Sequence, residues 1–405
     1  MSFSPNAVSQ APQRNYGACW FIAMALVFAV GMLGTTLPTP LYSLYQQRLG
    51  ISDLLVTVIF ATYAFGVLGA LVLTGSWSDQ VGRRPMIAGG LLFSAASSLL
   101  FLRGGSLWLL LFGRGLSGLS AGLLTATATV TIIELAPERQ KVHAAMLAAA
   151  ANMGGLGLGP LLAGAFSQYL PWPMRLTYLV HLGMIAVAAG MLQGCPETVE
   201  RPSRLRLRRQ TLRLPAAVRA AFLPAAVASF AGFALLGLLT SLEPAIAGRI
   251  IGVTNRALIG ALVFLVFMAS LCGQILQRRL ASSRQLPVSC VVLILGAGLL
   301  AGSIAFSSFA LLIFGAMVSG LGQGGIFAAS ILAVTAASPA NERAEVTSLL
   351  FIVIYLAVAL PVLGLGVAAD AVGLRAAGIT FTVLVMLTSI AALAVLIRRR
   401  PDTLS

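Results

Sequence analysis

Long apolar runs separated by short polar breaks fill almost the whole chain. A helix needs roughly 20 mostly apolar residues to cross the hydrocarbon core of a bilayer, and most of these runs reach that length. The runs, each bounded by charged residues, Pro or Gly, are 18–41, 54–76, 86–102, 107–133, 142–166, 175–194, 221–243, 256–276, 286–306, 309–336, 345–369 and 376–397. The pattern predicts an all-α integral membrane protein with twelve transmembrane helices.

The longest polar stretch divides the runs into two equal groups. Six runs occupy residues 18–194 and six occupy 221–397, and each block is 177 residues long. The stretch between them, 195–220, is basic and is expected to be a cytosolic linker between two six-helix bundles. Polar tails at 1–17 and 398–405 flank the bundles, and the first lacks the apolar segment of a cleaved signal peptide.

The two groups of helices also resemble each other in sequence. Five small or turn-forming residues of the first group recur in the second at one constant spacing of 202 positions. They are Gly113, Ser117, Gly118, Gly122 and Pro137, followed by Gly315, Ser319, Gly320, Gly324 and Pro339. The recurrence indicates an internal repeat. Two repeated bundles around a site in the middle of the membrane are typical of transporters.

Composition and charge support a membrane protein and argue against a nucleic-acid binder. The chain is 59% hydrophobic and 9% charged, with a mean hydropathy of +0.96, which no ordinary soluble domain shows. The net charge of +15 is unevenly distributed, since 19 Lys and Arg residues fall in alternate loops and the tails and six in the other loops. Basic residues concentrate on the cytosolic side of membrane proteins, so both termini are expected in the cytosol.

One polar loop, Gly75-Ser-Trp-Ser-Asp-Gln-Val-Gly-Arg-Arg, stands out between the second and third runs. Gly75 allows helices to approach closely, and Gly82 supplies a turn. Arg83 and Arg84 also serve as ordinary topology signals. Asp79 is harder to explain in that way, because an acid has little weight in membrane topology. It can instead cap a helix N-terminus or pair with an arginine when the cytosolic side closes, so we interpret the loop as a conformational latch.

This loop resembles the G-x-x-x-D-x-x-G-R-R signature of the major facilitator superfamily, with Gln80 at a usually basic position. The matching segment of the second half, Gly273 to Arg279, has Gln277 in place of the acid. The resemblance extends over the whole chain and implies two pseudo-symmetric six-helix bundles.

Two further segments resemble signatures of the same family. Leu111-Phe-Gly-Arg114-Gly-Leu-Ser-Gly118 is similar to the fourth-helix signature, an arginine on a glycine-rich helix. The segment from Gly155 through Gly159 and Pro160 to Gly164 resembles the fifth-helix antiporter signature, although Ala163 and Met146 replace two of its glycines. That signature is associated with export. The same residues also suit plain helix packing and a bend at the proline.

Arg114 is the strongest candidate for a residue of the transport pathway. It is placed seven residues, roughly 10 Å, inside its helix, where a charge is costly unless it faces a wet cavity or a partner. Ser117 and Thr125 lie on the same face of the helix, and Gln323 lies on the matching helix of the second half. The alternative is a structural arginine whose side chain extends to the membrane surface.

Other polar residues within the helices give weaker signals. Each is more often a packing residue with a satisfied hydrogen bond, and His181 in addition could titrate near neutral pH. They are Thr35, Thr36, Thr39 and Tyr42 around the prolines of the first helix, Asn152 in the fifth, His181 in the sixth and Tyr355 in the eleventh.

No carboxylate is expected in the middle of the membrane, since all eleven acids fall at helix ends, in loops or in the tail. The nearest candidates for a proton-binding group are Glu134, Asp53 and Glu243. The lack of a central acid argues against permanently cationic substrates. The lack of clustered His, Asp, Glu and Cys argues against an intramembrane enzyme.

The sequence therefore predicts a monomeric, multi-pass transporter of the inner (plasma) membrane that exports a small hydrophobic drug or metabolite by alternating access. A proton gradient is the expected driver, because the chain contains no nucleotide-binding loop. No cofactor, metal or nucleic acid is expected. The alternatives are an uptake symporter, a uniporter, or a sensor that has lost transport.

Overall fold

The computed structural model describes residues 19–74, 77–199, 214–339 and 342–398. Twelve helices in this part of the chain are long and apolar enough to cross a membrane. They are α1 (Cys19–Thr36), α3 (Asp53–Thr74), α5 (Arg83–Arg103), α6 (Leu107–Leu135), α7 (Lys141–Tyr169), α8 (Leu176–Gly194), α9 (Arg219–Ser241), α11 (Arg256–Leu276), α12 (Ser282–Ala305), α13 (Phe309–Ala337), α14 (Arg343–Val372) and α15 (Leu374–Arg398). Each of the twelve predicted runs corresponds to one of them.

Shorter helical turns connect these long helices. They are η1 (Thr39–Leu41), α2 (Tyr42–Leu49), α4 (Ser78–Val81), η2 (Glu138–Gln140), η3 (Ala216–Val218), α10 (Glu243–Ala245), the π-helix η4 (Ile246–Ile251) and η5 (Gln277–Arg279). Residues 200–213 of the predicted linker, the N-terminal tail and residues 399–405 lie outside the described residues, whereas Arg398, predicted as the first tail residue, is the last residue of α15. The last part of the predicted linker is already helical, because η3 and the first turn of α9 begin before residue 221.

The helix ends follow local sequence signals. Side chains of Ser106, Asn255 and Ser308 cap the N-termini of α6, α11 and α13 by accepting hydrogen bonds from backbone N–H groups. The first run differs from its prediction. The helix α1 ends at Thr36 because Pro38 and Pro40 cannot donate backbone hydrogen bonds, and the chain continues through η1 into α2.

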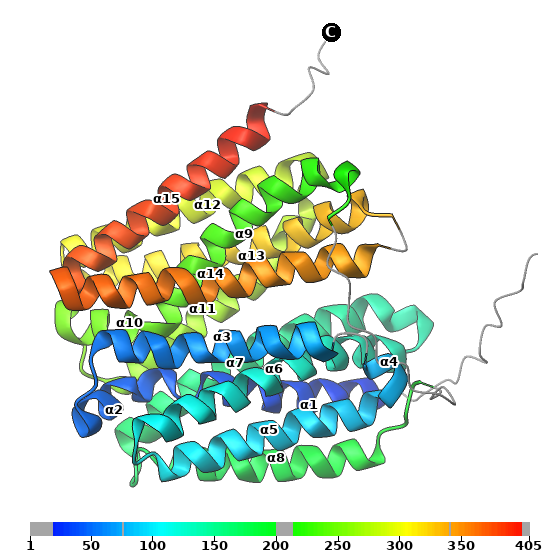
Figure 1. The fold of residues 1–405 in the computed structure, drawn as a ribbon, viewed down its shortest axis with the longest axis horizontal. Coiled ribbons are helices and arrows are strands. Elements are labelled where there is room, and N and C mark those ends of the chain that lie inside the picture. The colour runs from blue at the N-terminus through cyan, green and yellow to red at the C-terminus, as the bar shows by residue number, and fades with distance from the viewer. Residues whose placement is uncertain (1–18, 75–76, 200–213, 340–341, 399–405) are drawn as a thin grey trace, which may run out of the picture.

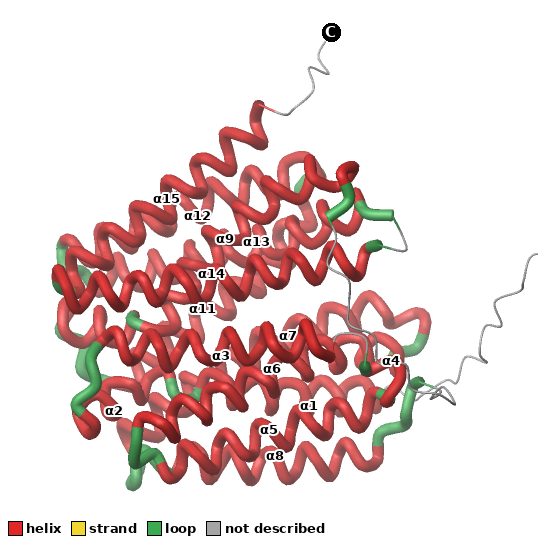
Figure 2. Tube along the Cα trace, in the orientation of Figure 1, coloured by secondary structure: helices red, strands yellow, loops and turns green. Residues whose placement is uncertain are grey.

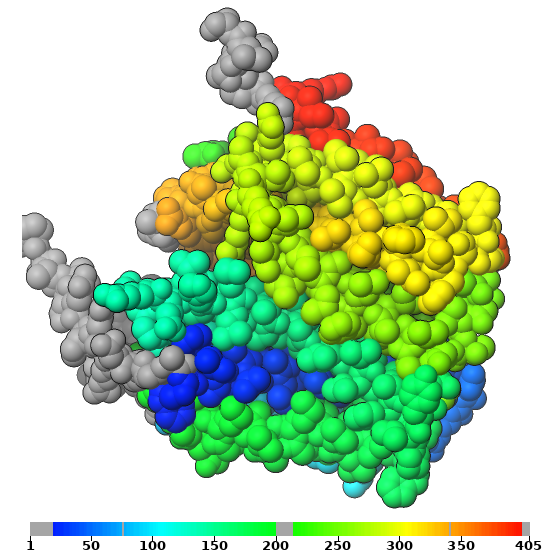
Figure 3. Space-filling model, turned by 180° about the vertical axis from the view of Figure 1, so that it is seen from behind, coloured from blue at the N-terminus to red at the C-terminus, as the bar shows by residue number. Residues whose placement is uncertain are grey.

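The helices form two six-helix halves (Figures 1 and 2). The helices α1, α3 and α5–α8 make up the N-terminal half, and α9 and α11–α15 make up the C-terminal half. We call the end of the bundle that carries Cys19, Arg83 and Arg398 the tail side, and the end that carries Leu49, Arg103 and Arg249 the distal side. Seen from behind in Figure 3, the blue-to-green N-terminal half lies below the C-terminal half, whose colour runs from green through yellow to red.

The internal repeat is visible in the way helices pack within each half. In the N-terminal half, a Cβ on Gly118 of α6 would lie 2.2 Å from the carbonyl oxygen of Tyr63 on α3. In the C-terminal half, a Cβ on Gly320 of α13 would lie 2.5 Å from the carbonyl oxygen of Val266 on α11. Since real Cβ atoms do not come this close, each position requires glycine. The same glycine-mediated contact is therefore built twice.

The halves are held together at the distal side. The helices α7 and α11 cross where Gly164 meets Gly260, and α3 meets α14 where Gly366 faces Thr57. Polar contacts add to this closure, since Arg256 donates from its backbone N–H to Gln168 and from its guanidinium to the carbonyl oxygen of Ser167. At the other end, the halves border a cavity that reaches the tail side.

Candidate functional site

A cavity of about 670 Å³ lies between the two halves. Its wall is formed by α1, α3, α6 and α7 of the first half and α9, α11, α13 and α14 of the second. It extends from Arg114, near the centre of the bundle, to Ala145, Arg343 and Ala344 in the first turns of α7 and α14. Because these first turns are at the tail side and the distal side is packed shut, the structure is open toward the tail side.

The charges of the cavity wall are of one sign. Among the described residues that line it, the charged side chains are Arg114 in the interior and Arg343 at the mouth, and none is Asp, Glu or His. The rest of the wall combines hydroxyl and amide groups with a largely apolar surface. A charge in such a site interacts strongly with a ligand of opposite charge because little water screens it.

Arg114 is 1% exposed and is surrounded by aromatic rings. Its guanidinium carbon lies 5.0 Å from the ring centroid of Tyr63, 5.5 Å from that of Phe60 and 5.9 Å from that of Tyr42. Its Nη1 donates to the carbonyl oxygen of Thr35, while Nε has no partner among the described residues. Ring faces and a carbonyl stabilise the cation without neutralising it. The arginine therefore keeps an uncompensated positive charge and a free donor.

Most of the predicted pathway residues line this cavity together with Arg114. They are Thr35, Thr36, Thr125, Asn152, Gln323 and Tyr355. Gln323 accepts a hydrogen bond of 2.7 Å from Ser270, and Thr36 donates to the carbonyl oxygen of Leu156 over 2.7 Å. The oxygen Oδ1 of Asn152 is buried and has no hydrogen-bond partner among the described residues.

Three other predicted residues lie outside the cavity wall. Ser117 and Thr39 are buried within the protein. His181 is 1% exposed and bonds through both ring nitrogens, with Nε2 3.1 Å from the carbonyl oxygen of Val30 and Nδ1 2.8 Å from the hydroxyl of Ser98. Because a carbonyl only accepts, Nε2 carries the proton and the Ser98 hydroxyl donates to Nδ1. These two hydrogen bonds, both within the N-terminal half, satisfy the one donor and the one acceptor of the neutral imidazole.

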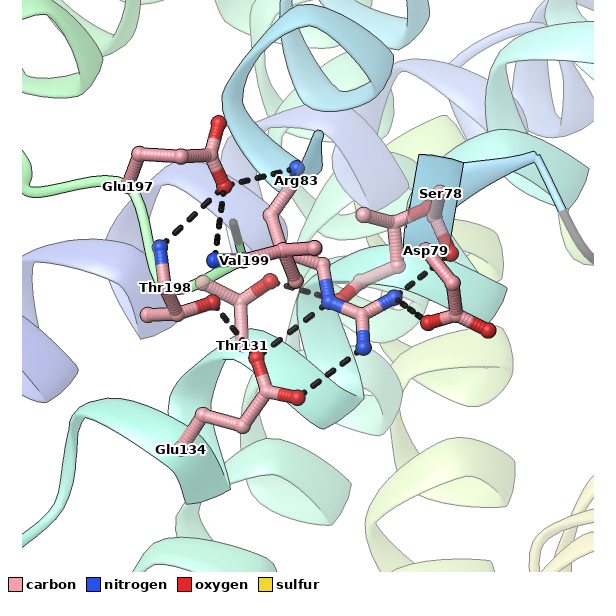
Figure 4. A network of polar contacts seen from close by, with 9 residues as sticks. Ser78, Asp79, Arg83, Thr131, Glu134, Glu197, Thr198 and Val199 are labelled. Atoms are coloured by element: carbon pink, nitrogen blue, oxygen red, sulfur yellow. Dashed lines mark hydrogen bonds and ion pairs between the residues drawn. The ribbon is translucent and has the colours of Figure 1, made fainter. Parts of the chain in front are cut away.

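The predicted latch residues form a polar cluster on the tail side of the N-terminal half (Figure 4). Arg83 is its centre. Its Nη1 lies 2.7 Å from Asp79 and 2.6 Å from the hydroxyl of Ser78, and Nε and Nη2 make a two-pronged contact with Glu134 at 3.2 and 2.9 Å. Asp79 has a 65% exposed side chain, whereas that of Arg83 is 8% exposed. Gly82, with φ of +105°, provides the turn into α5, and Gly75 lies outside the described residues.

Sequence reasoning missed a third carboxylate in this cluster. Glu197 accepts hydrogen bonds from the backbone N–H groups of Arg83 and Arg84 at 2.8 and 3.1 Å, so it caps the N-terminus of α5. The neighbouring Thr198 donates to Glu134 over 2.5 Å, and Arg84 donates to the carbonyl oxygen of Gln193. The segment after α8 therefore ties the latch loop to the rest of its half. A Pro-Glu-Thr sequence directly after an apolar helix was the available signal.

The aromatic wall of the C-terminal half was also missed. Phe233, Phe327 and Phe351 line the cavity from α9, α13 and α14. Their rings pack edge to face, with centroids 5.6 Å apart for the first pair and 6.1 Å apart for the second. Phenylalanines in apolar helices are too common to be singled out from sequence.

Another predicted carboxylate, Asp53, joins the two halves at the distal side. It is 6% exposed, and both of its oxygens lie 2.6 Å from Nη2 of Arg249 on η4. Gln46 of α2 donates to the same carboxylate over 2.9 Å. Both Asp53 and Glu134 are therefore ion-paired in this state, one between the halves and one within the N-terminal half.

The glycines of the predicted antiporter segment serve two different contacts along α7. A Cβ on Gly155 or Gly159 would collide with backbone atoms of α1 in the same half. A Cβ on Gly164 would collide with Arg256 of α11 in the other half, and the Pro160 carbonyl faces Gly260 there. One end of α7 is thus packed inside its own half, and the other end closes the distal side.

Comparisons with known proteins agree with this architecture. The chain is 24% identical over 185 residues to the "Putative multidrug resistance protein MdtD" of Shigella sonnei and of Escherichia coli K12, a match that covers 46% of the chain and 39% of those relatives. The matched region is therefore less than half the length of these curated relatives.

Solved structures match over nearly the full length. One is a bacterial homologue of the human lysosomal transporter Spinster, in an inward-facing and unoccupied conformation. It has a TM-score of 0.72 at 16% identity and covers 95% of this chain and 98% of its own. Another is the human organic anion transporter MFSD10, with a TM-score of 0.63 at 18% identity, covering 95% of this chain and 100% of its own. At such identities the likeness concerns the fold.

The family model described as Major Facilitator Superfamily matches residues 20–360, which is most of the chain. With twelve membrane-spanning helices in two repeated halves around a central cavity, the chain belongs to the Major Facilitator Superfamily of membrane transporters.

Proposed function

We propose that the protein exports a small hydrophobic molecule, neutral or negatively charged, by alternating access and proton antiport. The observation that carries this proposal is the cavity between the halves, which contains the uncompensated Arg114 and no carboxylate among its described lining residues. An apolar wall with few polar groups suits a hydrophobic ligand. A positive charge in its interior repels cations and binds an anionic or strongly polar group.

The direction of opening follows from the distribution of basic residues. Among the described residues outside the membrane-embedded Arg114, ten Lys and Arg lie at the tail side and six at the distal side, so the tail side is assigned to the cytosol. The cavity then opens to the cytosol, and both termini are cytosolic in an inner-membrane protein. A monomer suffices, since the cavity is enclosed by the two halves of one chain.

Alternating access requires the distal contacts to open and the tail side to close around the same cavity. We assign the distal closure to two contacts, the Gly164–Gly260 crossing and the Asp53–Arg249 pair. The part of α7 that packs on α1 through Gly155 and Gly159 is assigned to the rigid N-terminal half. Asp79 is assigned to a latch of the tail side. In the present tail-open state its side chain is 65% exposed and already pairs with Arg83 of the same half, so the latch requires a further contact of Asp79 that forms when the tail side closes.

The match to a protein named for multidrug resistance, although it covers less than half of each chain, favours export of drug-like compounds over uptake. The segment from Gly155 to Gly164 favours the same direction. Proton movement into the cell as substrate leaves is the matching energy source.

The test starts from hydrophobic dyes of similar mass that are neutral, anionic or cationic. Purified protein is screened for a rise in melting temperature with each dye. We expect the neutral and anionic dyes to stabilise the protein and the stabilisation by anions to be lost in Arg114→Ala. A dye that binds is then followed in proteoliposomes under an imposed pH gradient, with internal pH recorded. Stabilisation by cations alone would contradict the substrate class, and dye flux that ignores the gradient would contradict antiport.

A further inference from the structure

Glu243 is a buried acid that the cavity and the latch leave unexplained. It begins the single turn of α10, directly after α9 reaches the distal side. The residue is 2% exposed, and neither carboxylate oxygen has a hydrogen-bond partner among the described residues. An ionised carboxylate in such a place is costly, and such groups become protonated instead.

The elements packed against α10 do not compensate its charge. They are α9, η4 and, from the other half, α2. In α2, Tyr45 bonds to the hydroxyl of Tyr178 and Arg48 contacts the sulfur of Met174, while the hydroxyl of Tyr42 has no described partner. In η4, Arg249 is bound to Asp53. In α9, the titratable residue is Arg219, which lies at the opposite end of the helix.

Burial is therefore the cause that raises the pKa of the Glu243 carboxyl well above its ordinary value. The neutral acid is the form that the closed distal side accommodates. Its position also matters, because α10 belongs to the C-terminal half and α2 to the N-terminal half. When the halves separate at the distal side, the contact between α10 and α2 must break, and water reaches the carboxyl group.

We propose that Glu243 is a proton-binding site whose protonation from the distal side allows the distal side to close. The open state, with a hydrated carboxyl, binds the proton less tightly than the closed state. By linkage, a proton that binds one state more tightly stabilises that state. Closure is favoured at low pH and is progressively lost as pH rises above the pKa of the open state. In this window the ratio of closed to open changes by up to tenfold per pH unit.

The inference deepens the proposed function and rests on its assignment of the distal side to the outside of the cell. A proton taken up there closes the distal side and opens the cavity to the cytosol. Thr240, one helical turn before Glu243, lines the cavity, so the proton has a short route into the cavity and then to the cytosol.

The sign of the pH response makes the assignment specific. Protonation of Glu243 closes the distal side as pH falls, whereas loss of the Asp53–Arg249 pair opens it.

The experiment measures the distance across the distal side by spin labels. Gln47 and Thr254 are exposed and belong to different halves, so cysteines are placed there in a chain whose four native cysteines are replaced by alanine. The labelled protein, in lipid nanodiscs without substrate, is measured from pH 5 to pH 9. We expect the long-distance population to increase with pH in the parent. In Glu243→Gln, which mimics the protonated acid, we expect the short distance at every pH.

Matched variants complete the test. Asp370 is an exposed acid at the distal end of α14, and Asp370→Asn is expected to keep the pH response of the parent. Asp53→Asn is expected to raise the open population at all pH values while keeping the direction of the response. If Glu243→Gln does not insert, Glu243→Met removes the same titration with a side chain of similar length.

A parent without pH dependence, or a Glu243→Gln protein that keeps it, overturns the proposal. The result of this test can be told apart from a failure of the proposed function. A pH-dependent distance that needs Glu243, together with substrate flux that carries no protons, would retain the switch and reject antiport. Proton-coupled flux with a distance that ignores Glu243 would retain antiport and reject this site.

Discussion

The helices α6 and α13 occupy equivalent positions in the two halves, yet they carry different chemistry. Their glycines match, and Gly118 and Gly320 make the same close contact with a neighbouring helix. At the position of Arg114, however, α13 has Ala316, and the surrounding wall is built from the rings of Phe233, Phe327 and Phe351. The repeat conserves the backbone packing, while the charge is confined to the N-terminal half.

The loops that follow the second helix of each half differ in the same way. Asp79 pairs with Arg83, whereas the equivalent Gln277 is buried and its Oε1 has no described partner. The two halves therefore contribute differently to the cavity and to the tail side. The N-terminal half holds Arg114 and the Asp79 loop, and the C-terminal half contributes the aromatic wall of the cavity.

The largest expected effect tests the shared scaffold. We expect Gly118→Val and Gly320→Val to abolish folded protein equally, because each added side chain meets a backbone carbonyl, at a cost of about 3 kcal/mol. Monodisperse yield after solubilisation is the measurement. Gly298→Val is the control, since its Cβ would have no neighbour within 4 Å. A folded variant in one half alone would show that the packing is not equivalent.

The next largest effect on transport is expected at Arg114, the charge of the N-terminal half that has no equivalent in the C-terminal half. We expect Arg114→Ala to insert and fold but to lose transport by about 100-fold or more, since the remaining wall offers no strong anchor. Arg114→Lys should retain part of the activity, because lysine lacks the planar fork of donors. Flux in proteoliposomes is measured beside Ala316→Ser, which should stay within about twofold of the parent. Parent-like flux in both arginine variants would make Arg114 a structural residue.

The smallest effect is expected at the latch. In the present state Asp79 is exposed and Arg83 is also held by Glu134, so Asp79 contributes little here. In the latch hypothesis, Asp79 caps a neighbouring helix N-terminus or pairs with an arginine when the tail side closes. We expect Asp79→Asn to shift the population about tenfold toward the tail-open state, or ~1.4 kcal/mol, and to reduce transport.

The latch prediction is measured by the alkylation rate of a cysteine placed at Ala344, in the cavity mouth. Gln277→Asn serves as the control in the other half and is expected to leave this rate unchanged. Equal alkylation rates in Asp79→Asn and the parent, together with normal flux, would contradict the latch hypothesis.

The sequence by itself determined the membrane class, the twelve helices and the repeat. Hydrophobic length and glycine spacing are local properties of the chain, and a bilayer restricts the possible folds strongly. Arg114 was found for the same reason, because a charge deep in an apolar helix is conspicuous wherever the helix packs.

Only the tertiary structure decided which polar residues meet. Thr35 and Thr36 reach the cavity while His181 and Ser117 do not, and one-dimensional periodicity does not distinguish these positions because every face of these helices is apolar. The isolation of Glu243, like the pairing of Asp53 with Arg249, depends on contacts between halves far apart in sequence. The energy of a buried charge is set by its neighbours in space, so these roles follow from the packing of the two halves.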